Sequence, residues 1–144
     1  MNTTPVIPAV TLELAHFAAD LNYQQLPKAV VEHAKLALLD GVGVILQGRQ
    51  LPWSQMLTEL VINDGGTPEA SLIGSAVKVP AAAAALVNAT AGHAFELDDI
   101  HRDSIVHPNS ICVPVALNMA ERAGGCSGQK IITAIVAGYE IANR

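Results

Sequence analysis

The chain has 144 residues and a mass of 15.0 kDa, which is enough for one domain of ordinary size. Hydrophobic residues make up 51% of the sequence and charged residues 15%, a balance that excludes an intrinsically disordered chain. The net charge of −5 and the lack of a basic run argue against nucleic-acid binding, and no apolar run reaches the roughly 18 residues of a membrane span.

Apolar residues recur at helical spacing along most of the chain, which predicts an all-α fold. Thr11 and Ser127 are suitable N-caps for the first and last helices, and Pro27 suits the first turn of the second helix. The short alternating segment at residues 69–79, around Gly74, predicts an extended segment or a small hairpin. We expect a helical bundle-like domain whose helices cover residues 11–21, 27–47, 52–62, 80–96, 110–123 and 127–144.

The second predicted helix contains two glycines, Gly41 and Gly43. Inside a helix each costs about 1 kcal/mol relative to alanine, so they either weaken the helix or mark a close contact with another one. The apolar side of this helix is formed by Val30, Ala34, Ala37, Leu38 and Ile45.

Several predicted helices lack the charged face that a surface helix normally shows. Residues 80–95 contain no charged side chain when His93 is counted as neutral, and residues 131–142 contain only Glu140. A domain of this size cannot bury several such helices, so we expect a homodimer or a higher homo-oligomer. The first ten residues resemble no secretion signal, and only two cysteines are present, which predicts a cytoplasmic protein.

Ionisable side chains are scarce in the chain but dense at residues 93–107. Alanine-rich helices flank this stretch, so we expect some of these groups to lie against apolar packing, as acid–base catalysts do. Pro108 favours extended backbone at His107, and a helix starting at Ser110 would offer free N–H groups to a substrate carboxylate. The ionisable residues of the stretch are His93, Glu96, Asp98, Asp99, His101, Arg102, Asp103 and His107.

Two alternatives to an acid–base site stay open. The stretch can be a solvated loop in a catalytically silent helical dimerisation module. It can also be a metal site, because His93 and Glu96 are spaced i,i+3 and His101 follows, which suits a metal-dependent hydrolase. The chain has neither an HExxH motif nor an EF-hand loop, so the acid–base site is the preferred interpretation.

Four stretches of the chain, in the right order, resemble the N-terminal part of the MmgE/PrpD family. They are residues 13–48, 81–101, 107–110 and 127–144. The most specific parts are the pattern His-Ala-x-x-x-Asp-Asp at 93–99, the His-Pro pair at 107–108, and Gly-Tyr-Glu at 138–140 with the trailing Arg144.

The resemblance implies a large all-helical domain and a smaller α/β lid. Residues 1–144 would then be the N-terminal part of the helical domain, with the lid and the C-terminal remainder absent. Family members are usually dimeric and need no metal or organic cofactor. They include 2-methylcitrate dehydratase, cis-aconitate decarboxylase and iminodisuccinate epimerase, which share proton transfer at a carbon next to a carboxylate or an equivalent group.

The resemblance also carries over to single residues. Glu96 aligns with an active-site aspartate of the family and is one methylene longer, whereas Ile100 replaces a threonine and lacks its hydroxyl. The direct matches are Asp98, Asp99 and His107.

We therefore expect a fragment or short relative of a cofactor-independent lyase or isomerase that acts on a small di- or tricarboxylate. The chain alone is expected to be inactive, because further active-site groups of the family have no counterpart in it. His107 is the expected general acid or base, with Glu96 and Asp99 as the other catalytic residues. The expected substrate-binding residues are His93, Asp98, His101, Arg102 and Ser110, and no metal ligand is expected.

Overall fold

The computed structural model describes residues 9–144 and confirms the all-α fold with one short hairpin. A 3-10 turn, Tyr23–Gln25, precedes the second helix. The hairpin pairs β1 (Ala70–Ser71) with β2 (Lys78–Val79) in antiparallel register. The α-helices of the described residues are α1 (Val10–Asp20), α2 (Lys28–Gly48), α3 (Pro52–Asp64), α4 (Ala81–His93), α5 (Pro108–Arg122) and α6 (Gly128–Asn143).

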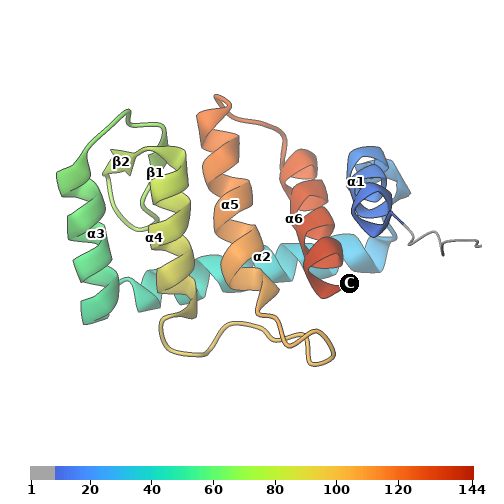
Figure 1. The fold of residues 1–144 in the computed structure, drawn as a ribbon, viewed down its shortest axis with the longest axis horizontal. Helices are drawn as coiled ribbons and strands as arrows, with labels where there is room; N and C mark the ends of the chain where they lie inside the picture. Colours follow the sequence, from blue (N-terminus) through green and yellow to red (C-terminus); the bar gives the residue numbers. More distant parts are fainter. Residues whose placement is uncertain (1–8) are drawn as a thin grey trace, which may run out of the picture.

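Helices α3, α4, α5 and α6 stand side by side in chain order, and the long helix α2 runs across one end of this row (Figure 1). Helix α2 contacts α4, α5 and α6, while α1 packs beyond α6 at the end of the row. The long connection between α4 and α5, residues 94–107, loops out at the same end of the row as α2. This loop contains most of the ionisable stretch.

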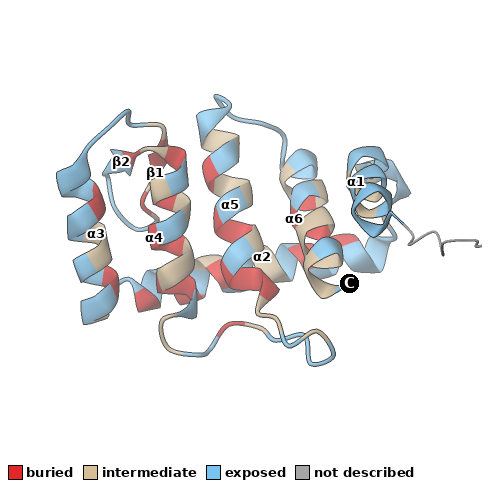
Figure 2. Cartoon of the chain, in the orientation of Figure 1, coloured by how far each residue is buried: buried red, intermediate tan, exposed pale blue. Residues whose placement is uncertain are grey.

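Buried residues, red in Figure 2, lie along the row of helices and on α2, and most of the apolar ones belong to two clusters. One lies between α3, the hairpin and α4 and contains Val61, Ala70, Leu72, Val79, Ala81, Ala84 and Val87. The other joins α2, α5 and α6 and contains Val31, Ala34, Val113, Ile132, Ile135 and Val136. No helix within residues 9–144 is long and apolar enough to cross a membrane.

Apart from the start at Pro52, the predicted helix ends are shifted by one to three residues. Pro27 occupies the N-cap position of α2 and not its first turn. Three further shifts affect the caps and the loop. Helix α1 begins at Val10 with Ala9 at its N-cap, so Thr11 is not the cap. Helix α5 begins at Pro108 rather than Ser110, because proline suits the first turn of a helix, where its missing N–H costs nothing. Helix α4 ends at His93, before Glu96, whose positive φ of 60° is incompatible with a right-handed helix. Ser127 is confirmed as the N-cap of α6, since its side chain accepts a hydrogen bond from the Lys130 N–H.

Of the two glycines in α2, only Gly41 marks a close helix contact. A Cβ atom at Gly41 would overlap with Asn109 Oδ1 and press on the side chain of Val113, both on α5. A Cβ atom at Gly43 would meet open space. The missing side chain at Gly41 therefore lets α5 approach α2 closely.

The hairpin is attached to the helices through buried amide side chains. Asn88 of α4 accepts a hydrogen bond of 2.9 Å from the Ile73 N–H and donates to the Ser71 carbonyl over 3.0 Å. Asn118 of α5 donates to the same carbonyl, also over 3.0 Å. The two asparagines bond to each other as well, so the hairpin, α4 and α5 form one hydrogen-bonded unit.

Candidate functional site

The candidate site lies where the loop 94–107 leaves α4 and enters α5. His93 is the last residue of α4 and His107 occupies the N-cap position of α5. Their rings meet edge to face, with centroids 4.7 Å apart. Two histidines that are fourteen positions apart in the sequence are thus neighbours, because the loop closes on itself between two adjacent helices.

Asp98 lies between these two histidines and is the most buried ionisable group of the loop. Its side chain is 0% exposed, and its carboxylate is 3.0 Å from Nδ1 of His93 and 3.5 Å from Nδ1 of His107. No lysine or arginine pairs with Asp98 within residues 9–144. A buried carboxylate needs a compensating positive charge or a hydrogen-bond donor, and the two imidazoles are the side chains placed to supply it.

Glu96 reaches the same histidine pair from the outer side. Its carboxylate is 3.4 Å from Nε2 of His93, and its side chain is largely exposed. His93 therefore lies between two carboxylates, with Asp98 at Nδ1 and Glu96 at Nε2. A proton on Nδ1 would be donated to Asp98, and a proton on Nε2 would face Glu96.

Asp99, the next residue, serves a different set of partners. Its Oδ1 accepts a hydrogen bond of 2.9 Å from the Asn109 N–H in the first turn of α5, and its Oδ2 accepts one of 2.8 Å from the Tyr139 hydroxyl of α6. Burial and the hydrogen bond to Asp99 raise the pKa of the Tyr139 phenol, so the phenol stays protonated and donates. Asp99 thereby connects the loop to both α5 and α6.

Asn109 extends this connection to α2. Its side-chain amide donates to the Ala37 carbonyl over 3.0 Å and to Asp40 Oδ2 over 3.2 Å. Asn109 is 1% exposed, and its backbone N–H is the one held by Asp99. The start of α5, and with it His107, is therefore anchored to the loop and to α2.

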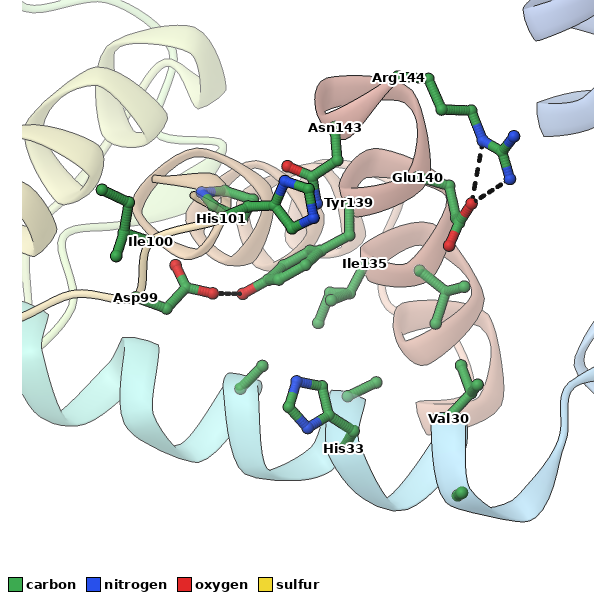
Figure 3. A pocket seen from close by; sticks show the side chains of 15 residues that line it. Val30, His33, Asp99, Ile100, His101, Ile135, Tyr139, Glu140, Asn143 and Arg144 are labelled. Atoms are coloured by element: carbon green, nitrogen blue, oxygen red, sulfur yellow. Dashed lines mark hydrogen bonds and ion pairs between the residues drawn. The ribbon is translucent and has the colours of Figure 1, made fainter. Parts of the chain in front are cut away.

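A cavity of about 770 Å³ lies on the Asp99 side of the loop, between α2 and α6 (Figure 3). Asp99, Ile100 and His101 form one wall of it, and the Asp99–Tyr139 hydrogen bond spans its inner side. Neither His93 nor His107 lines this cavity. Ionisable or polar side chains around it are those of His33, Asp99, His101, Tyr139, Glu140, Asn143 and Arg144.

The structure does not bring all of the expected site residues together. Nδ1 of His101 bonds to the Ser104 hydroxyl over 2.8 Å, away from the histidine pair, and Arg102 is exposed. Ser110 is buried and donates from its hydroxyl to the His107 carbonyl over 3.1 Å. Within residues 9–144, the metal-type group whose ligand atoms converge is His93, Asp98 and His107. The trio His93, Glu96 and His101 that a hydrolase would use does not converge in this part of the chain.

Comparison with known proteins identifies the lineage of this arrangement. A family model described as the MmgE/PrpD N-terminal domain matches residues 12–144. The chain belongs to the MmgE/PrpD family. Its ordered histidine and aspartate motifs, on which the resemblance rested, are therefore part of a family match that covers nearly the whole chain.

Two fungal relatives show where this MmgE/PrpD chain matches longer proteins. A cis-aconitate decarboxylase of Aspergillus terreus is 32% identical over 135 residues, covering 91% of the chain and 28% of the relative. A cis-aconitate decarboxylase-like protein, oryM, of Aspergillus oryzae is 33% identical over 143 residues, covering 94% of the chain and 29% of the relative. The chain thus spans less than a third of the length of these relatives.

The most consequential residues that sequence reasoning missed in this MmgE/PrpD chain are Tyr139 and Asn109. Tyr139 was visible as the centre of the Gly-Tyr-Glu motif, but nothing local indicated that its hydroxyl reaches Asp99. Asn109 follows His107-Pro108 in the sequence, and its contacts with α2 are long-range. Cys112 lies near the same network, and burial, with the Asp99 carboxylate second, raises the pKa of its thiol to about 11.

Proposed function

We propose that this chain contributes the N-terminal part of the helical domain of an MmgE/PrpD lyase that acts on a small di- or tricarboxylate. The observation that carries the proposal is the buried Asp98 carboxylate between the imidazoles of His93 and His107. A carboxylate that orients an imidazole and stabilises its protonated form is a recurrent component of acid–base catalysis. The names of the fungal relatives favour decarboxylation over dehydration or epimerisation.

In the proposed decarboxylation, the bond between the reacting carbon and its carboxylate breaks and carbon dioxide leaves. The electron pair stays on the carbon, where a neighbouring conjugated carboxylate spreads the charge. His107, in its imidazolium form, then donates a proton to that carbon. Asp98 stabilises the imidazolium before the transfer, and positioned acids of this kind contribute about 10²–10⁴-fold to rate.

The other expected residues take supporting roles in this proposal. Glu96 and His93 form the exposed side of the histidine pair, where a substrate would enter, since the side chain of His93 is 45% exposed. Asp99 is better supported as a positioning residue than as a catalytic one, because both of its oxygens already accept hydrogen bonds from Asn109 and Tyr139.

We expected free N–H groups at a helix start at Ser110; in the structure α5 starts at Pro108, and the Asn109 N–H of its first turn is held by Asp99. We therefore assign substrate binding to the exposed face of the histidine pair and only secondarily to the start of α5 at Ser110. A di- or tricarboxylate needs more cations than this segment supplies. We propose that the remaining cations come from further sequence, such as the lid, or from a second copy in a cytoplasmic homodimer.

The test is the substitution His107→Ala in the polypeptide at its native length, which intact-mass measurement in its source establishes. With cis-aconitate as substrate and carbon dioxide release as the signal, we expect kcat to fall by roughly 10²-fold or more. His16→Ala, an exposed histidine of α1, is the matched control and should leave turnover unchanged. Unchanged turnover in His107→Ala would remove His107 from the mechanism. A native mass of 15 kDa with no turnover would favour the silent dimerisation module.

A further inference from the structure

The histidine pair and Asp98 have a second chemical capacity. We propose that His93, Asp98 and His107 form a binding site for one divalent transition-metal ion of the zinc class, which blocks proton transfer by His107. One ligand atom from each residue lies within 4.8 Å of the other two. The donor set, two imidazole nitrogens and one carboxylate oxygen, is one that zinc, cobalt, nickel and iron(II) prefer.

The distances within the cluster match those that a metal requires. Ligand atoms about 2.0–2.2 Å from a tetrahedral ion are roughly 3.3–3.6 Å apart. Asp98 Oδ2 is 3.0 Å from Nδ1 of His93 and 3.5 Å from Nδ1 of His107. Two edges of the coordination triangle are thus already close to the required length, and the edge between the two imidazoles is at most 4.8 Å.

The electrostatics of the cluster favour a bound cation. The Asp98 side chain is fully buried, and its ion-pair partners within residues 9–144 are the two histidines. When both imidazoles are neutral, its negative charge has no cationic partner in the part of the chain that the structure describes, and a divalent cation supplies one. In addition, Nδ1 of His107 is buried and has no hydrogen-bond partner among residues 9–144, which leaves a nitrogen available for coordination.

The surroundings complete the resemblance to a metal centre. The Nε2 atom of His93 is 3.4 Å from the Glu96 carboxylate, the arrangement in which an outer carboxylate orients a metal-binding imidazole. The side chains of His93 and His107 are 45% and 27% exposed, so an ion has a route in and water can fill the open coordination position. The site resembles an open centre more than a closed structural one.

Binding is tested with Zn²⁺ alone, by calorimetry on the purified chain. The background carries Cys126→Ser, because that exposed thiol would itself bind zinc. We expect about one ion per chain, no binding of Mg²⁺, and at least tenfold weaker Zn²⁺ binding in His93→Ala, His107→Ala and Asp98→Asn. The control His33→Ala, an exposed histidine of α2, should bind as the parent does. Absence of zinc binding, or unchanged binding in all three variants, overturns the site.

A second measurement needs no variant of the cluster and so does not depend on how the variants fold. Bound Zn²⁺ should protect His93 and His107 from acylation by diethyl pyrocarbonate, while the exposed His16 and His33 remain reactive. Equal acylation of all four histidines with and without zinc overturns the proposal.

The inhibitory consequence rests on the proposed function, whereas metal binding does not. In the polypeptide at its native length, Zn²⁺ should lower turnover and EDTA should restore it. If zinc binds at the cluster but turnover is unchanged, the proposed role of His107 and the proposed inhibition are both overturned, whereas the metal site itself stands. If the parent protein binds no zinc and its His107→Ala variant is inactive, the metal site is overturned and the proposed role of His107 stands.

Discussion

Asp99 and Tyr139, forty residues apart in the sequence, are joined by a hydrogen bond of 2.8 Å from the phenol to Oδ2. The other oxygen of Asp99 holds the Asn109 N–H at the start of α5. One carboxylate therefore fixes the loop against two helices, and the position of His107 depends on it. This relationship makes Tyr139 the most informative residue outside the loop.

The substitution Tyr139→Phe removes the phenol and leaves an oxygen of Asp99 without its donor. Because the group is partly buried, we expect a loss of about 1–3 kcal/mol in the free energy of unfolding, measured by urea denaturation. Tyr23→Phe is the control, since none of the hydrogen bonds among the described residues involves the phenol of this half-buried tyrosine. Equal stability of the two variants would contradict the assigned role of Tyr139.

Gly41 and Gly43 offer a matched pair in one helix. Alanine at Gly41 would press against Asn109 and Val113, so we expect Gly41→Ala to lower the free energy of unfolding by about 1–3 kcal/mol. Alanine at Gly43 meets no atom and should raise it by about 0.5–1 kcal/mol through better helix propensity. Thermal denaturation measures both, and a stabilised Gly41→Ala variant would refute the close contact of α2 with α5.

The two cysteines should differ strongly in reactivity toward a thiol reagent. Cys126 is exposed, whereas Cys112 is partly buried, and burial together with Asp99 raises the pKa of its thiol to about 11. Because the thiolate is the reactive form, alkylation of Cys112 at pH 8 should be slow and should accelerate as the pH approaches 11. Mass spectrometry after iodoacetamide treatment, with Cys126→Ser as the single-thiol reference, measures this. Fast labelling of Cys112 at pH 8 in the folded chain would count against its burial.

Oligomeric assembly remains a prediction from the apolar helices. Leu36 and Leu39 of α2 are 64% and 71% exposed, and Met56 of α3 is 70% exposed, so large apolar side chains are uncovered in the single chain. We expect light scattering at micromolar concentration to give at least twice 15.0 kDa. The double variant Leu36→Glu, Leu39→Glu should shift the mass toward the monomer. A clean monomer of the parent chain that binds no hydrophobic dye would refute the prediction.

Local sequence signals predicted the elements well because helices and hairpins are local structures. The hairpin near residues 69–79 and the cap at Ser127 followed from the alternation pattern and the capping chemistry of short segments. The buried side of α2 was only partly predicted. Ala34 and Ile45 are buried, but Val30 is exposed and its neighbour Val31 is in the core, because packing against α5 and α6 selects the face.

The high local density of ionisable residues made it possible to predict which residues belong to the site. It did not predict which of them lie next to one another. Asp98 and Asp99 are adjacent in the sequence, yet one faces the histidine pair and the other faces α5 and α6. No periodicity governs an irregular loop, so the sequence could not assign the two carboxylates to different partners. The roles of Tyr139 and Asn109 depend on contacts between distant helices, which a single sequence does not encode in a readable pattern.

The loop also contains an exposed β-branched residue with left-handed backbone, since Ile105 has a φ of 55° and is 81% exposed. For such a residue this conformation costs about 1–2 kcal/mol, and an exposed side chain recovers little of that by packing. Asparagine adopts the same conformation more readily. The tip of this loop is consequently a place where protein engineering can gain thermal tolerance without touching the histidine pair.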